Sequence, residues 1–219
     1  LNFDKTLKLK NSSRKKSFFV GLPIDHRINL KNRNTDTDKK RHIKVFICGG
    51  SQGAVSLNKI IIGLFNKIPR NILDRIQVSI QCPESQKEEI QASFNKLSIK
   101  YELRYFFCNF VEKLYETDVL IARAGAGTVN DVIFTQTPTI FVPLPFSANN
   151  HQFYNANYLK QKEAALLIKQ EDLNSKQSLS TVIKLINNFN QQINLIKKLQ
   201  EIKNFDTNKL IFKHLNDKI

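Results

Sequence analysis

Apolar and polar positions follow two alternating periods from about residue 43 onward. Short runs rich in β-branched residues recur, and longer runs with apolar residues three or four positions apart separate them. This alternation is typical of βαβ units and predicts an α/β fold with a Rossmann-like parallel sheet. The expected strands are 43–48, 77–81, 101–106, 119–122, 139–142 and 165–168, with helices at about 54–67, 85–96, 128–136 and 150–161.

The two ends of the chain have a different pattern. Residues 1–42 lack a sustained period and end in a polar, charged run, which predicts a linker or the remnant of an N-terminal domain. After Glu171 the spacing is helical, with segments near 178–190, 191–203 and 207–217. We therefore divide the chain into 1–42, an α/β domain over 43–170, and C-terminal helices over 171–219.

Charge changes this picture only for the first segment. The net charge of +15 would suit a nucleic-acid-binding module, which would need a basic face on the folded domain. However, residues 1–44 hold 13 Lys and Arg against four Asp, and acidic residues are interleaved with basic ones beyond that point. The distribution argues against nucleic acid. It favours either a basic segment that attracts anionic lipid or a plain solvated tail.

Composition narrows the cellular setting. No apolar run approaches the roughly 20 residues of a membrane-spanning helix, and the chain does not start like a secretory signal. Cys48, Cys82 and Cys108 lie apart in apolar segments, which predicts buried, reduced thiols of a cytosolic protein. The sequence has no Met, even at position 1, so we expect it to be truncated at its N-terminus.

The first candidate for chemistry is the turn Gly49-Gly50-Ser51-Gln52-Gly53, between an apolar strand and a helix. Glycines allow a close backbone approach to a ligand, and the free N–H groups and dipole of a helix start favour phosphate. The alternative is a tight structural turn with Ser51 as its N-cap. The spacing is not G-x-G-x-x-G, and no acidic residue ends the second strand, so a nicotinamide cofactor is disfavoured.

A second glycine-rich turn, 123–131, follows the fourth expected strand. Two such turns in one parallel sheet bring two helix N-termini to its carboxyl edge, where open α/β sheets bind ligands. The alternative is a capping box, with Thr128 as the N-cap and Asp131 in place of the usual Glu or Gln.

The third candidate is the segment 142–156, again strand, loop and helix start. Gln152 would lie in the first helical turn at the same edge, and its amide suits sugar hydroxyls because it both donates and accepts hydrogen bonds. The pair Asp36 and Asp38 matches a D-x-D metal motif, but it follows no apolar strand that would hold two carboxylates in place. We expect neither a metal nor a cofactor.

Together these segments resemble the C-terminal, donor-binding domain of the MurG family, bacterial transferases that add N-acetylglucosamine to lipid I. The resemblance covers about residues 20–203 and rests on the motifs GGSQGA, RAGAGTVND, and PLP followed by NNHQFYNA. It implies the donor half of a GT-B glycosyltransferase in peptidoglycan synthesis and cell division. It also implies UDP-N-acetylglucosamine as donor, lipid I as acceptor, and a peripheral place on the cytoplasmic face of the inner membrane.

The same resemblance assigns roles residue by residue. Ser51 would contact the diphosphate, a backbone group of Val111 the uracil edge, and Gln152 the sugar. The stretch from Ala126 to Asp131 would line the nucleotide-sugar pocket, with Asp131 where the family usually has a Glu that holds the ribose. The residues of that stretch are Ala126, Gly127, Thr128, Val129, Asn130 and Asp131.

The chain departs from the family at Asp25, where the family usually carries an Arg beside the nucleotide. Arg27 is an alternative source of that charge. The family's other half, with its candidate base and its membrane-facing surface, would precede residue 20. We therefore expect a hexosyltransferase domain that binds donor but holds no catalytic residue, and that needs a separate or missing N-terminal half. The rivals are an inactive gene remnant and, less favoured, a basic nucleic-acid-binding module.

Overall fold

Six parallel strands form one sheet in the computed structural model, which describes residues 42–202 and 207–216, and within them all side chains except those of 51–54, 208 and 214. The strand order is β3-β2-β1-β4-β5-β6. The strands are β1 Ile43–Cys48, β2 Ile76–Gln81, β3 Lys100–Arg104, β4 Val119–Ala122, β5 Thr139–Phe141 and β6 Leu166–Leu167. The predicted α/β fold with a Rossmann-like parallel sheet is confirmed.

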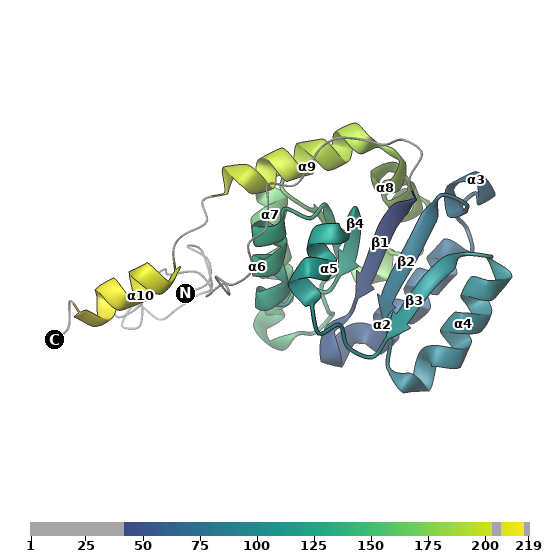
Figure 1. Ribbon diagram of the computed structural model, residues 1–219, viewed down its shortest axis with the longest axis horizontal. Helices are drawn as coiled ribbons and strands as arrows, with labels where there is room; N and C mark the ends of the chain where they lie inside the picture. The colour runs from purple at the N-terminus through teal and green to yellow at the C-terminus, as the bar shows by residue number, and fades with distance from the viewer. Residues whose placement is uncertain (1–41, 203–206, 217–219) are drawn as a thin grey trace.

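Helices cover both faces of this sheet (Figure 1). Those that connect the strands are α2 Gly50–Phe65, α3 Arg70–Leu73, α4 Lys87–Lys96, α5 Phe110–Glu116, α6 Ala126–Thr135 and α7 His151–Gln161. Short 3-10 turns lie at η1 Glu84–Gln86, η2 Ala148–Asn150 and η3 Gln170–Asp172. The C-terminal helices are α8 Lys176–Asn187, α9 Phe189–Glu201 and α10 Thr207–Asn216.

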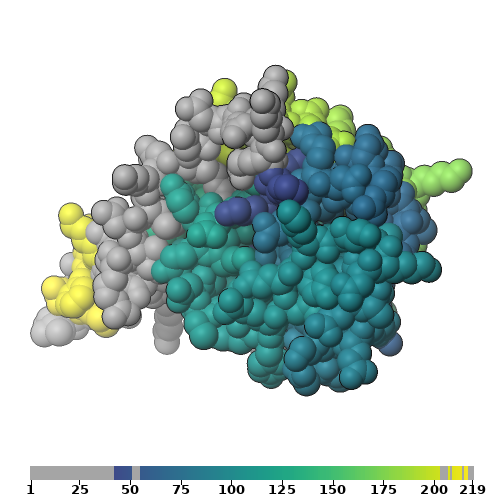
Figure 2. All heavy atoms as spheres, turned by 45° about the vertical axis from the view of Figure 1, so that its right-hand side comes forward, coloured from purple at the N-terminus to yellow at the C-terminus, as the bar shows by residue number. Residues whose placement is uncertain are grey.

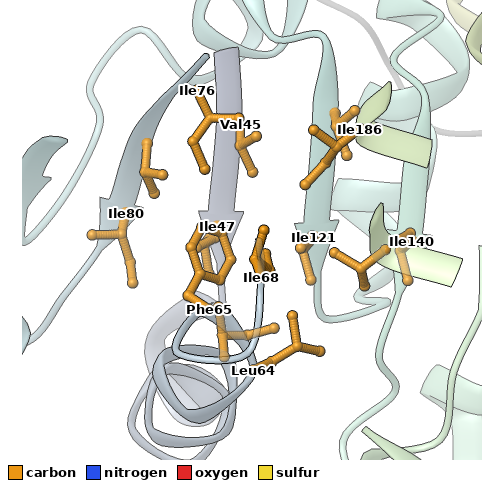
Figure 3. Packing of buried hydrophobic residues seen from close by; sticks show 14 of the residues in the cluster. Val45, Ile47, Leu64, Phe65, Ile68, Ile76, Ile80, Ile121, Ile140 and Ile186 are labelled. Carbon is orange, nitrogen blue, oxygen red and sulfur yellow. The ribbon is translucent and has the colours of Figure 1, made fainter. Parts of the chain in front are cut away.

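Alternation along the strands sorts their side chains between two cores. On β1, Val45 and Ile47 face the core that α2, α4 and α8 complete, and Phe46 and Cys48 face the core with α5, α6 and α7. Figure 3 shows the first of these cores, where isoleucines of neighbouring strands meet Leu64 and Phe65 of α2. Both faces of the strands are buried, which explains why they read as unbroken apolar runs.

The C-terminal helices are part of this packing. Val182 and Leu185 of α8 belong to the first core, and Leu199 of α9 belongs to the second. Asn188 separates the two helices, and its side-chain oxygen accepts the backbone N–H of Gln191 at 3.1 Å. The expected helical segments after Glu171 are therefore confirmed, with the first break at Asn188.

Several predicted boundaries are wrong. The third strand ends at Arg104 rather than at 106, because Tyr105 and Phe106 are exposed and cannot join a buried ladder. The first helix begins at Gly50, four residues before its predicted start, and the helices α3 and α5 were missed. Both missed helices are short, so their apolar period is hard to see. Cys48 and Cys82 are buried as expected, but Cys108 is exposed.

Candidate functional site at the carboxyl edge of the sheet

The glycine-rich turns emerge side by side at the centre of the sheet. The strand order reverses between β1 and β4, whose last paired residues are Cys48 and Ala122. The N–H of Arg123 donates to the Cys48 carbonyl at 3.1 Å, and that of Val142, just after β5, donates to the Ala122 carbonyl at 2.8 Å. All three segments leave the sheet at its carboxyl edge, and the reversal point is where such sheets bind ligands.

The first turn is shorter than the sequence indicated. Gly49 is the N-cap of α2, and Gly50 is already helical in sequence order but has φ +65°, a left-handed conformation that favours glycine. Ser51 is therefore the second helical residue, and its alternative role as the N-cap is wrong. The first turn of α2 has no acidic residue. Its free N–H groups and the helix dipole make this end attractive to an anion.

The second turn follows the same plan. Gly125, in an extended conformation, is the N-cap of α6, so Thr128 lies inside the first turn and the predicted capping box is wrong. No acidic residue lies in this first turn either. Gly127 is exposed, and a Cβ built there would meet nothing within 4 Å, so its backbone is open to a ligand. Two helix starts without negative charge thus lie next to each other.

The side chains from 126 to 131 are not equivalent. Val129 is fully buried in the second core, so only its backbone could line a pocket. Ala126, Thr128 and Asn130 are half-buried. Asp131 is also half-buried, and its carboxylate makes no hydrogen bond or ion pair with the described residues. Burial raises the pKa of Asp131 from 3.8 to about 6.

Gln152 lies in the first turn of α7 at the same edge, as predicted. Its Oε1 accepts the backbone N–H of Leu144 at 3.0 Å. Because that N–H can only donate, the orientation of the amide is determined and its NH₂ group is left to donate. His151, the first residue of α7, makes a 2.8 Å hydrogen bond between Nδ1 and the Ala148 carbonyl.

Val111 lies at the start of α5, which follows β3 and so begins near the same edge. Asn109 is the N-cap and the first intrahelical bond runs from the Lys113 N–H to the Asn109 carbonyl, at 2.9 Å. The N–H of Val111 therefore has no acceptor within the helix and is available to a ligand. Phe107 and Phe110 pack against Phe46 of β1 and hold this segment in place.

Two buried polar side chains were not predicted as part of the site. Arg123, only 4% exposed, donates from Nη1 to the carbonyls of Val142 and Pro143, at 3.1 and 3.2 Å. Its Nη2 donates to Ser56 Oγ at 2.7 Å and to Gln170 Oε1 at 2.5 Å. Asn155 of α7 donates to the Ala124 carbonyl at 3.0 Å. A charged residue directly after a fully apolar strand was the available signal for Arg123.

Other sequence hypotheses lie outside the described residues, namely Asp25, Arg27 and the pair Asp36 and Asp38. Among residues 42–202 and 207–216, no three His, Cys, Asp or Glu side chains gather in a way that could hold a metal ion. In the same ranges no helix combines the length and the apolar character needed to cross a membrane. Figure 2 shows that atoms of the first coloured elements, in purple, reach the surface between blue and teal atoms of later segments.

Taken together, the fold and the edge define a nucleotide-binding α/β domain of the Rossmann-like kind. The chain belongs to the glycosyltransferase family 28 C-terminal domain family, which residues 44–211 match.

Individual relatives support the same family. The chain is 35% identical over 180 residues to the UDP-N-acetylglucosamine--N-acetylmuramyl-(pentapeptide) pyrophosphoryl-undecaprenol N-acetylglucosamine transferase of Rickettsia bellii, covering 78% of this chain and 49% of that protein. It is 36% identical to the transferase of the same name from Rickettsia felis over 174 residues, 74% of this chain and 48% of that one. The chain thus spans about half the length of these relatives.

Solved structures agree on the fold. The crystal structure of MurG from Acinetobacter baumannii superposes with a TM-score of 0.72 at 23% identity, and the match covers 84% of this chain and 55% of that one. The glycosyltransferase TarM of S. aureus, described in complex with UDP and other ligands, gives a TM-score of 0.60 at 12% identity, over 91% of this chain and 38% of that one. The C-terminal half of a GT-B glycosyltransferase, predicted from the sequence, is confirmed as the fold.

Proposed function

We propose that this chain is the donor-binding half of a glycosyltransferase that moves N-acetylglucosamine from UDP-N-acetylglucosamine to lipid I in peptidoglycan synthesis. The observation that carries the proposal is the pair of glycine-capped helix starts, α2 and α6, at the β1–β4 reversal point, in a chain of this family. Relatives named for this reaction support the choice of donor and acceptor.

Each part of the donor has a suitable partner at the edge. The diphosphate would lie at the start of α2, where Ser51 adds a hydroxyl donor, and at the open backbone of the 126–131 stretch. The Asp131 carboxylate would accept hydrogen bonds from the ribose hydroxyls. The free N–H of Val111 would meet a carbonyl of uracil, and the NH₂ of Gln152 would donate to an oxygen of the sugar.

This arrangement also indicates how the chain would assist transfer. When the bond to the sugar breaks, negative charge grows on the departing UDP. Unsatisfied N–H groups and the dipoles of two helices are already oriented toward that charge, so they stabilise it without rearrangement. In our proposal the chain's own polar groups, rather than a metal or a cofactor, fill this role.

The acceptor side is proposed to lie elsewhere. Because the chain matches only about half of its relatives' length, we propose that residues 43–170 bind the donor, that 171–219 are supporting helices, and that 1–42 lead to a second half holding lipid I and the base. The basic residues before position 44 would assist peripheral contact with anionic lipid at the cytoplasmic face of the inner membrane.

Calorimetry provides the test. UDP-N-acetylglucosamine and UDP should bind, UDP-glucose should bind more weakly, and a short RNA should not compete. Transfer to lipid I should be seen only when an N-terminal half is supplied. If no uridine ligand binds at millimolar concentration, or if RNA binds in preference, the proposed function is wrong.

A further inference from the structure

Arg123 and Gln152 hold opposite sides of a single peptide group. Arg123 Nη1 donates to the Pro143 carbonyl at 3.2 Å, while Gln152 Oε1 accepts the Leu144 N–H at 3.0 Å. The carbonyl of residue 143 and the N–H of residue 144 belong to the same planar amide. Rotation of this amide would break both hydrogen bonds at once.

The remaining contacts of Arg123 give it a rigid position. Its side chain is buried, and the same Nη1 also reaches the Val142 carbonyl at 3.1 Å at the end of β5. Nη2 reaches Ser56 of α2 and Gln170 of η3. A planar guanidinium that donates to several fixed acceptors loses little freedom on binding each of them, so it sets the geometry of its partners well.

Gln152 depends on this geometry more than other residues of the edge do. Its amide could turn by half a rotation and present an oxygen instead of an NH₂ group, with almost no change in shape. Only the Leu144 N–H is seen to select one of these two orientations. The direction of that N–H is in turn determined by the amide that Arg123 holds.

We propose that Arg123 is a positioning residue for sugar recognition: through the 143–144 amide it holds Gln152 with its NH₂ group toward the donor sugar. This inference rests on the proposed function for its ligand, but the geometric link can be tested without any ligand. Arg123 is not proposed to touch the donor itself.

The ligand-independent test is amide hydrogen exchange of Leu144, measured by NMR on the full chain. In the wild-type chain the Leu144 N–H should exchange at least tenfold more slowly than that of Phe146, a fully exposed loop residue. In Arg123→Lys, Leu144 should lose most of this protection while core amides such as Leu120 keep theirs. Equal exchange of Leu144 and Phe146 in the wild type would overturn the inference even if no variant folds.

The ligand test compares UDP-N-acetylglucosamine with UDP. Because Arg123→Lys loses the two-sided fork, it should weaken UDP-N-acetylglucosamine about tenfold but UDP less than about twofold. A purely structural role would weaken both ligands equally, and that result would overturn the inference. If wild type binds neither ligand while Leu144 is protected, the proposed function fails but the positioning link survives.

Matched variants complete the design. Gln170→Ala removes a contact of Nη2 and leaves both Nη1 contacts, so the ratio of the two affinities should stay within about twofold of wild type. Arg70→Lys makes the same substitution on exposed α3, which precedes β2 at the other edge, and should change neither affinity. In a Gln152→Ala background, Arg123→Lys should no longer change the ratio, and an additive effect would contradict the proposed link.

Discussion

Replacing Asp131 by Asn should move stability and donor affinity in opposite directions. Burial raises the pKa of Asp131 from 3.8 to about 6, so the folded state holds the proton more tightly than the unfolded chain does. Stability therefore falls as the pH rises from about 3.8 to about 6, and at pH 7 the full penalty is present. A shift of about two pKa units corresponds to about 3 kcal/mol, which partial exposure to solvent reduces to about 1–2 kcal/mol.

Asn carries no charge, so Asp131→Asn should recover this penalty. Thermal unfolding followed by circular dichroism should show a Tm about 2–8 °C higher than wild type at pH 7, and a difference close to zero at pH 3.5. The same variant should bind UDP-N-acetylglucosamine about 10- to 100-fold more weakly, because ribose hydroxyls donate more strongly to a carboxylate than to a neutral amide.

The control is Asp74→Asn, at the exposed end of α3, where Asp74 pairs with Arg70 at 2.8 Å. It should leave donor affinity unchanged and should not raise the Tm. Our account of Asp131 would be refuted if Asp131→Asn were no more stable than wild type at pH 7, or if it bound the donor with unchanged affinity.

Four other outcomes are expected. Donor affinity of the wild type should decline as the pH is lowered through about 6, since Asp131 takes up a proton; a flat calorimetric profile from pH 7.5 to 5 would exclude its role. Ser51→Ala should weaken UDP about 10- to 100-fold, and unchanged binding would leave Ser51 with no contact to phosphate. Gly50→Ala should destabilise the fold by about 1 kcal/mol in urea unfolding, because φ there is +65° although space for a Cβ exists; equal stability would mean the turn relaxes. Of the thiols, exposed Cys108 should react with a thiol reagent first and Cys48, whose pKa burial raises to about 11, far more slowly; equal rates would contradict the fold around β1.

Much of the candidate site follows from local pattern. The apolar runs around Val45 and Leu120 predicted neighbouring buried strands, and the glycines after them predicted helix starts at one edge. Both expectations depend only on residues close in the chain. The start of α2 was misplaced because glycine is a poor helix former in general, whereas Gly50 and Gly53 here are held at the start of a helix that packs on the sheet.

The sequence alone was sufficient for the fold class, the placement of Gln152 in a first helical turn and the family, because strand alternation and short motifs are local properties. Only the tertiary structure decided which orientation Gln152 adopts, that Asp131 is half-buried, and that Arg123 joins α2, β5 and η3. These features depend on residues far apart in the chain, such as Ser56, Arg123 and Gln170, that meet only after the strands have paired. The two glycine-rich turns could be recognised from the sequence, but the buried guanidinium that links their surroundings could not.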